Sequence, residues 1–305
     1  MRPTLPGEGS ARGAAGGGPG DRAAAARRLW SVACFLAAGA ALLASLLGAD
    51  RGGDDEAAAP PDSVRLAGIT AEARATLAGA KRPGPLQVGE DLTFEIHYGV
   101  IRAGEAHLAI AGVESFHGAR CYRLRSTARS GGLFGKIYDV NDRVESLLDS
   151  AGLMSRRLEK RLHEGSYHQE QDVRFDYGAR RACYASGDTL PIPGPVQDDL
   201  SAFYVARCLE LRENTVYYLE THSNKVTYPM QVRVYGRETV RTEAGEFECL
   251  KVEPRVDRGG IFKHRGRMMI WMTADARHLP VRLRSKLPLG AITADLSAAQ
   301  AGGTH

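Results

Sequence analysis

Two adjacent carboxylates, Asp198 and Asp199, stand at the start of a short apolar segment near the middle of this 305-residue chain. Paired carboxylates can divide general acid and general base roles, so with a histidine brought near by folding they would suit a hydrolase acting on glycan or lipid. The alternative is structural, because an aspartate directly before a helix caps its free N–H groups and complements the helix dipole. We expect the structural role, and we assign no catalytic residue.

Other motifs that could carry chemistry are weak or missing. The run HEGSYH (163–168) is one residue too long for the zinc pattern HExxH and is expected at a strand turn. His97 and His107 are expected on one polar face of a hairpin, where we expect solvent contact rather than a metal. The sequence has no Gly-x-Ser-x-Gly, no phosphate loop and no dinucleotide fingerprint. We therefore expect no metal and no cofactor.

The composition excludes a dedicated nucleic-acid binder. The net charge is only +4, and the basic residues are mixed with acidic ones along the chain. With 43% hydrophobic and 25% charged residues the chain can build a core. The first 28 residues are rich in Gly, Ala, Pro and Arg, so we expect a disordered N-terminal tail there.

Residues 29–49 form an apolar run without a charge, long enough to cross a bilayer as a helix. Arg27 and Arg28 precede the run and Asp50 follows it, which places the N-terminus in the cytoplasm and the rest of the chain outside. We expect an uncleaved anchor in a bacterial inner membrane, and the alternative is a cleaved signal that leaves a soluble periplasmic protein. Residues 50–84 are interpreted as a linker or stalk.

From residue 85 the hydrophobic period becomes two, which indicates antiparallel strands up to residue 297. Two segments, 88–165 and 216–290, share a motif: CYRLRSTARSGGLFGK (121–136) aligns without a gap on CLKVEPRVDRGGIFKH (249–264). The pattern predicts an all-β fold in which two pseudo-repeated meanders form a curved sheet or a barrel-like shell. Residues 298–305 are expected to be a tail.

A single helix is expected at 198–210, between the two meanders. Leu200, Phe203 and Tyr204 recur at helical spacing, and Asp198 is a good N-cap. Sheets of many strands curl and must bury their concave face. We therefore expect this helix to fill the shell, with Leu200, Phe203 and Tyr204 as the plug.

Cysteines raise the question of disulfides, because exported compartments are often oxidising. Cys121 and Cys249 occupy matched positions of the repeat, and Cys183 and Cys208 complete the set in the expected exported part. Two arrangements of Cys121 and Cys249 are consistent with the sequence: a symmetric disulfide between them, or a buried thiol at each position. We favour the buried thiols.

The matched Gly-Gly loops each place a phenylalanine beside basic residues. Such tips suit an anionic amphiphile, a lipid headgroup or a membrane surface. The alternative, which we favour, is that the two phenylalanines fold inward and cap the shell. The candidate contact residues are Phe134, Lys136, Phe262, Lys263, His264 and Arg265.

Four segments together give the chain a family resemblance: VGEDLTFEIHYGVIRAGEA, PVQDDLSAFYVARCLEL, AGEFECLKVEP and IWMTADARHLPVRLRSKLPLGAITADL. Over residues 88–296 the chain resembles the bacterial family called domain of unknown function 3108. The resemblance implies an exported, β-rich envelope protein and supplies no catalytic residues. The expected function is a membrane-anchored, non-enzymatic β-domain that binds a lipid-like ligand, an envelope polymer or an envelope protein. The alternatives are an envelope hydrolase and a purely structural envelope subunit.

Overall fold

The computed structural model describes residues 70–81, 84–256, 267–287 and 290–303. Alternating apolar residues put one face of each strand in the core, so the first part of the chain forms a meander of antiparallel strands. Its strands are β1 (Asp91–Tyr98), β2 (Ile101–Phe116), β3 (Ala119–Ser130), β4 (Asn141–Asp149), β5 (Ser155–Glu164), β6 (Tyr167–Asp176), β7 (Arg181–Tyr184) and β8 (Thr189–Pro191).

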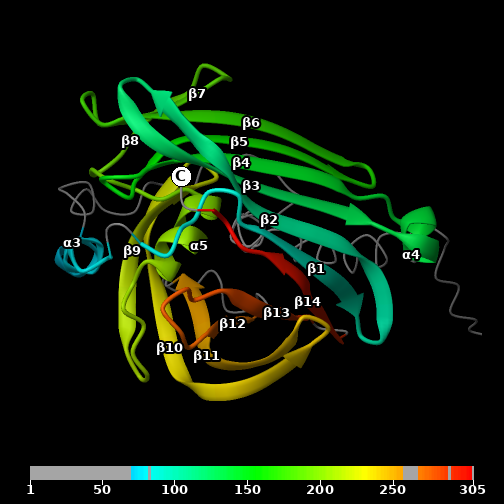
Figure 1. The fold of residues 1–305 in the computed structure, drawn as a ribbon. Helices are drawn as coiled ribbons and strands as arrows, with labels where there is room; N and C mark the ends of the chain where they lie inside the picture. Colours follow the sequence, from blue (N-terminus) through cyan, green and yellow to red (C-terminus); the bar gives the residue numbers. More distant parts are fainter. Residues whose placement is uncertain (1–69, 82–83, 257–266, 288–289, 304–305) are drawn as a thin grey trace, which may run out of the picture.

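A second antiparallel meander follows and joins the first through the pairing of β1 with the last strand. Its strands are β9 (Val216–Ser223), β10 (Val226–Thr242), β11 (Gly245–Val256), β12 (Met268–Thr273), β13 (Pro280–Leu287) and β14 (Gly290–Gln300). The described strands form one 14-stranded sheet in the order β8-β7-β6-β5-β4-β3-β2-β1-β14-β13-β12-β11-β10-β9. The all-β, antiparallel fold expected from the sequence is confirmed, and the sheet is curved but not closed into a barrel (Figure 1).

The two meanders share local features at the matched motif. β2 has a register shift between Ile110 and Gly112, and β10 has one between Val234 and Arg237. Cys121 and Cys249, in the strands that follow, each direct their Sγ at the carbonyl oxygen two residues earlier, at 3.6 Å. Duplication of one ancestral meander stays a prediction.

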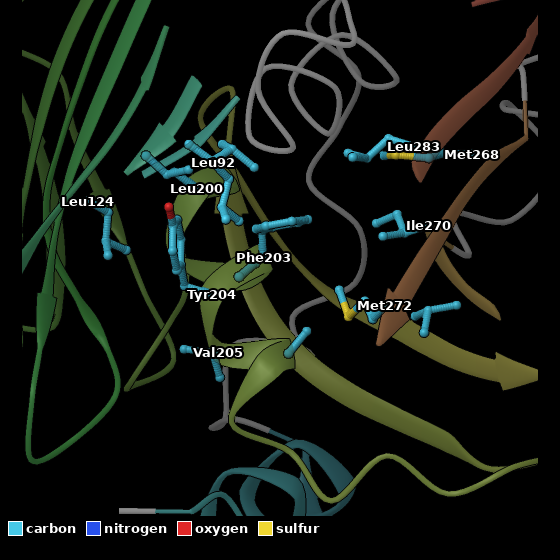
Figure 2. Packing of buried hydrophobic residues seen from close by; sticks show 14 of the residues in the cluster. Leu92, Leu124, Leu200, Phe203, Tyr204, Val205, Met268, Ile270, Met272 and Leu283 are labelled. Atoms are coloured by element: carbon cyan, nitrogen blue, oxygen red, sulfur yellow. The ribbon is translucent and has the colours of Figure 1, made fainter. Parts of the chain in front are cut away.

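Helix α5 (Asp199–Arg207) lies inside the curve of the sheet (Figure 1). Asp198 caps it by accepting hydrogen bonds from Leu200 N and Ser201 N, and every residue of the helix is buried. Figure 2 shows its side chains between Leu92 and Leu124 on one side and the strand residues of the second meander on the other. The second group consists of Met268, Ile270, Met272 and Leu283, all buried.

Two further short helices lie at the margins of the curved sheet. α3 (Ala71–Ala78) covers the edge strand β9, and the Tyr218 N–H donates to Thr76 Oγ1 at 3.2 Å. This helix lies in the range 50–84 that we interpreted as a stalk, and it protects the sheet edge from pairing with another chain. α4 (Gly132–Ile137) joins β3 to β4. β14 runs to Gln300, into the range expected to be a tail.

The expected membrane anchor, residues 29–49, lies outside the described residues. Among the residues that the structure does describe, none of the helices has the length and apolar character needed to span a bilayer.

Candidate functional site

The edge strands β8 and β9 do not pair in the described part of the chain, and the region between them is called the seam below. The segment before α5 crosses one end of it. The Gln197 N–H donates to Glu220 O at 2.8 Å, and the His222 N–H donates to Gln197 O at 2.7 Å. On the other side the Ser155 N–H donates to Val196 O at 3.0 Å. The backbone before α5 thus hydrogen-bonds to the edge strand β9 on one side and to the start of β5 on the other.

Side chains close the seam further along. Tyr184 Oη of β7 lies 2.7 Å from His222 Nε2 of β9, and His222 Nδ1 lies 2.7 Å from Thr227 Oγ1. Burial, followed by the nearby Lys160 charge, lowers the pKa of His222 to about 4, so the imidazole is neutral at pH 7. Tyr184 Oη also accepts from the Lys225 N–H at 3.0 Å, so the phenol links β7 to both His222 and the start of β10.

Behind this contact lies a buried ion pair between Lys160 of β5 and Asp199, the first residue of α5. Neither side chain is exposed to solvent. Asp199 Oδ2 accepts from the ammonium, while Asp199 Oδ1 has no hydrogen-bond partner among the described residues. A buried acceptor without a partner loses the hydration it had in the unfolded chain, typically at about 1–3 kcal/mol.

Both carboxylate oxygens of Asp198 accept hydrogen bonds from within the fold. Its Oδ1 accepts from Leu200 N and Ser201 N at 2.8 Å each, and its Oδ2 accepts from Ser146 Oγ at 2.6 Å and from Ser155 Oγ. Burial is the largest cause that raises the pKa of this carboxyl. These contacts fix the start of α5 to β4 and β5 and leave Asp198 no position for a substrate.

A pocket of about 460 Å³ opens at the seam and is called the seam pocket below. Arg157 on its wall is held by Asp172 through two hydrogen bonds of 3.0 and 2.6 Å, and Lys225 is held by Asp188 at 2.6 Å. Gln171 Oε1, in contrast, is buried without a partner in the described chain. The pocket is lined by Arg157, Glu159, Lys160, Arg161, Gln169, Glu170, Gln171, Asp172, Tyr184, Ala185, Ser186 and Lys225.

The sequence analysis singled out two groups of residues, the plug of the central helix and the contact residues of the Gly-Gly loops. The plug and the described residues of the first loop lie in different parts of the fold. Leu200, Phe203 and Tyr204 are buried on α5 beside Asp198, and Phe203 and Tyr204 pack edge to face with ring centroids 5.8 Å apart. Phe134 lies in α4, far along the sheet from α5, and packs partly buried against the core. Lys136 is exposed on the same short helix.

The other four candidate contact residues belong to the second Gly-Gly loop. Phe262, Lys263, His264 and Arg265 lie outside the described residues. The strand ends that flank them, Val256 and Met268, lie at the end of the sheet that also carries α4, because successive strands are antiparallel.

Several other sequence expectations concern cysteines and histidines. Cys121, Cys183, Cys208 and Cys249 are all free thiols. The rings of His163 and His168 contact each other with centroids 4.2 Å apart and planes tilted by 47°. Within the described ranges there is no group of three or more His, Cys, Asp or Glu side chains placed to hold a metal.

The sequence analysis did not identify the residues that form the seam. Lys160 carried the clearest signal, because it alternates in phase with the buried Leu158 and Leu162 and so occupies an inward position of β5. A lysine at an inward position of a strand needs a buried anion. Tyr184 and His222 are distant in sequence and carried no comparable signal.

Comparison with known proteins gives a family and a set of distant structures. The family model described as "Protein of unknown function (DUF3108)" matches residues 93–297. No curated protein matches the chain. A beta-barrel-like protein of domain of unknown function DUF1849 from Brucella abortus has 9% identity and a TM-score of 0.47, with 70% of this chain and 97% of that chain covered.

Two further solved structures are similar at lower TM-scores. One is a protein from Bacteroides fragilis described as exported, with a YmcC-like fold, at 13% identity and a TM-score of 0.33, covering 72% of this chain and 98% of that chain. The other is a protein from Parabacteroides distasonis described as a lipoprotein, at 10% identity and a TM-score of 0.33, covering 71% of this chain and 97% of that chain.

Proposed function

This chain belongs to the DUF3108 family, whose members are described as proteins of unknown function, and we propose that it is a non-enzymatic binding protein of the bacterial cell envelope. Its ligand is a hydroxyl-bearing unit of an envelope polymer, held in the seam pocket. The compartment follows from the apolar segment 29–49 and the charges around it. The ligand class follows from the polar atoms at the seam.

The observation that carries the proposal is an excess of hydrogen-bond acceptors at the seam. Asp199 Oδ1, Gln171 Oε1 and Ser223 Oγ are buried without a partner in the described chain. Gln171 lines the seam pocket, Asp199 holds the pocket-lining Lys160, and Ser223 ends the edge strand β9. Acceptors without partners favour a ligand that donates hydrogen bonds, and sugar hydroxyls are donors. A volume of about 460 Å³ lies in the range of small-ligand sites.

The charges of the pocket support a polar, uncharged ligand. Arg157 and Lys225 are each paired with a carboxylate, and Lys160 is neutralised by Asp199. A strongly anionic ligand would need to displace these partners. A polymer unit with several hydroxyls needs only the unpartnered acceptors.

An envelope hydrolase is the competing reading, because Lys160, Asp199, Tyr184 and His222 are residue types used in acid–base catalysis. The contacts of these residues argue against a hydrolase. Both ring nitrogens of His222 are engaged, and burial raises the pKa of Tyr184 above its ordinary value. Lys160 and Asp199 are held in an ion pair with no exposed side-chain surface. A purely structural role would not explain why these buried hydrogen-bond acceptors lack partners.

Binding of soluble glycan fragments to the full chain in detergent micelles tests the proposal. Fragments released from envelope polymers should bind the wild type, and Gln171→Leu should weaken binding about tenfold by removing one buried hydrogen-bonding group. Gln231→Leu on β10, which does not line the seam pocket, is the matched control and should bind normally. If no fragment binds and native mass spectrometry instead finds a co-purifying lipid retained by Gln171→Leu, the seam is not the binding site.

A further inference from the structure

One end of the sheet displays aliphatic side chains to solvent. Among the described residues only four large hydrophobic side chains are exposed: Val100 (98%), Ile101 (59%), Val113 (36%) and Ile137 (72%). Val100 and Ile101 lie at the β1–β2 turn, and Ile137 ends α4. Both elements lie at the same end, since the Gly131 N–H, at the start of α4, donates to Ala103 O of β2 at 3.0 Å (Figure 1). We call Val100, Ile101, Arg102, Lys136 and Ile137 the α4 rim.

The fold does not require an aliphatic residue at the tip of the turn. Gly99 has a φ of +60°, and Val100 is not among the residues with positive φ, which corresponds to a type II′ hairpin turn. In such a turn the glycine meets the backbone requirement, and the next position points to solvent and is usually polar. Val100 contributes nothing to the core at 98% exposure. Its side chain is therefore available to a partner.

The same reasoning applies to α4. Phe134 packs against the core and holds the helix on the sheet, while Ile137 at the end of the helix is 72% exposed. Lys136 beside it is exposed and has no ion-pair partner among the described residues. The helix thus presents one aliphatic and one cationic side chain outward.

Basic side chains flank the aliphatic ones on the neighbouring strands. Arg102 is 58% exposed and follows Ile101 directly. Lys286 is exposed and pairs in register with Ala291, whose carbonyl accepts from the Gly99 N–H at 3.1 Å. The acidic groups nearby are engaged: Glu95 and Glu105 contact Arg102, and Asp139 contacts His163 at 3.5 Å.

We propose that the α4 rim docks on an anionic membrane surface, with Val100, Ile101 and Ile137 entering the headgroup region and Lys136, unpaired among the described residues, contacting phosphate. Shallow insertion of a few aliphatic tips with adjacent cations is the chemistry of a peripheral membrane contact. A stable protein interface would need about 800 Å² from each partner, more than these separate tips supply. The 20 residues between Ala49 and Thr70 span up to about 70 Å when extended, enough for a sheet end to reach the bilayer from the expected anchor.

The test uses the full chain in proteoliposomes, with the photoreactive residue p-benzoylphenylalanine placed singly at position 100, 137 or 243. Glu243 is the matched control, because it is exposed in the β10–β11 turn at the opposite end of the sheet. In vesicles containing phosphatidylglycerol, lipid adducts at 100 and 137 should exceed those at 243 by about tenfold. Adding Lys136→Gln should lower the adducts at position 100 about fivefold, as expected for one lost surface charge.

Two results would overturn the proposal. Equal lipid adducts at 100, 137 and 243 would show that the anchor alone holds the domain near the bilayer. Adducts to protein in place of lipid in native membranes would show that the α4 rim is a protein interface. Because the side chains at 100 and 137 are exposed, the substitutions leave the fold intact, and a melting curve of each variant verifies this.

Discussion

Arg207, the last residue of α5, donates to both carboxylate oxygens of Glu90, with Nη1–Oε1 and Nη2–Oε2 distances of 2.6 and 2.8 Å. The guanidinium is fully buried, and it lies 5.5 Å from the Tyr204 ring centroid. Glu90 directly precedes β1, so this pair joins the end of the central helix to the strand that connects the two meanders. A cation at this position also complements the helix dipole.

Removal of one partner of this pair should be strongly destabilising. Glu90→Gln leaves a buried guanidinium with one charge uncompensated, so the free energy of unfolding should fall by about 3–5 kcal/mol. The double change Glu90→Leu with Arg207→Met should restore most of that loss, because no buried charge remains. Urea unfolding of both variants provides the comparison. Equal losses in the single and double variants would mean that packing, and not charge, explains the effect.

Phe203 provides a test of the plug. It is 4% exposed on α5, so Phe203→Ala should behave as a core truncation and lower the free energy of unfolding by about 3–5 kcal/mol. Val100→Ala, at the fully exposed turn tip, is the control and should change it by less than about 0.5 kcal/mol. An unchanged melting temperature in Phe203→Ala would show that this side chain does not stabilise the fold and that other residues fill the curved sheet.

Asp198 distinguishes capping from catalysis. Asp198→Asn keeps an acceptor for the helix N–H groups, and its amide can donate to the hydroxyls of Ser146 and Ser155, which rotate to accept. Burial raises the pKa of Asp198, so a neutral side chain also removes a penalty that grows as the pH rises through that pKa. Asp198→Ala should lower the free energy of unfolding by about 0.5–2 kcal/mol through the lost cap.

The measurement is a thermal melt of both Asp198 variants beside a complementation assay in a deletion strain. Asp198→Asn should melt close to the wild type and complement fully. A stable Asp198→Asn protein that fails to complement would instead show that the carboxylate acts chemically.

The sequence predicted local features well and long-range ones poorly. Alternation along each strand placed residues such as Leu92 and Phe94 on the buried face, and the spacing of Leu200, Phe203 and Tyr204 predicted the central helix. The seam depends on which strands become the two edges of the sheet. The hydrophobic period along a single strand does not determine the order of the strands. Lys160 and Asp199 are 39 positions apart and meet only because β5 and α5 pack together. Their pairing is a property of the fold and not of either segment.

The cysteines should be chemically inert in the folded protein. Burial raises the pKa of Cys121 and of Cys249 to about 11, so almost none of either thiol is present as the reactive thiolate at pH 7. Cys183 is partly exposed and should react first with a maleimide. Mass spectrometry of briefly labelled protein tests the order. Early modification of Cys121, or a Cys121–Cys249 disulfide in exported protein, would contradict the buried-thiol arrangement.

Asp142 and Glu164 give the fold a pH dependence. They lie on the inward faces of β4 and β5 near α4 and are only 3% and 5% exposed, so two carboxyl groups lie in an environment that disfavours their charged forms. The His163 N–H donates to Asp142 Oδ1 at 2.8 Å and partly offsets the burial. Burial still dominates and raises the pKa of Asp142 from 3.8 to about 7.

A raised folded-state pKa means that the native protein binds more protons than the unfolded chain between pH 3.8 and about 7. The resulting stabilisation is fully present below pH 3.8 and is lost as the pH rises through about 7. The shift of about 3 units sets an upper limit on the order of 4 kcal/mol for the loss. Asp142→Asn stays neutral, so the free energy of unfolding of this variant should exceed that of the wild type above pH 7 and converge with it as the pH falls. Urea unfolding from pH 5 to pH 9 measures both curves, and parallel curves would show that Asp142 ionises without a penalty and that the carboxyl pair is hydrated.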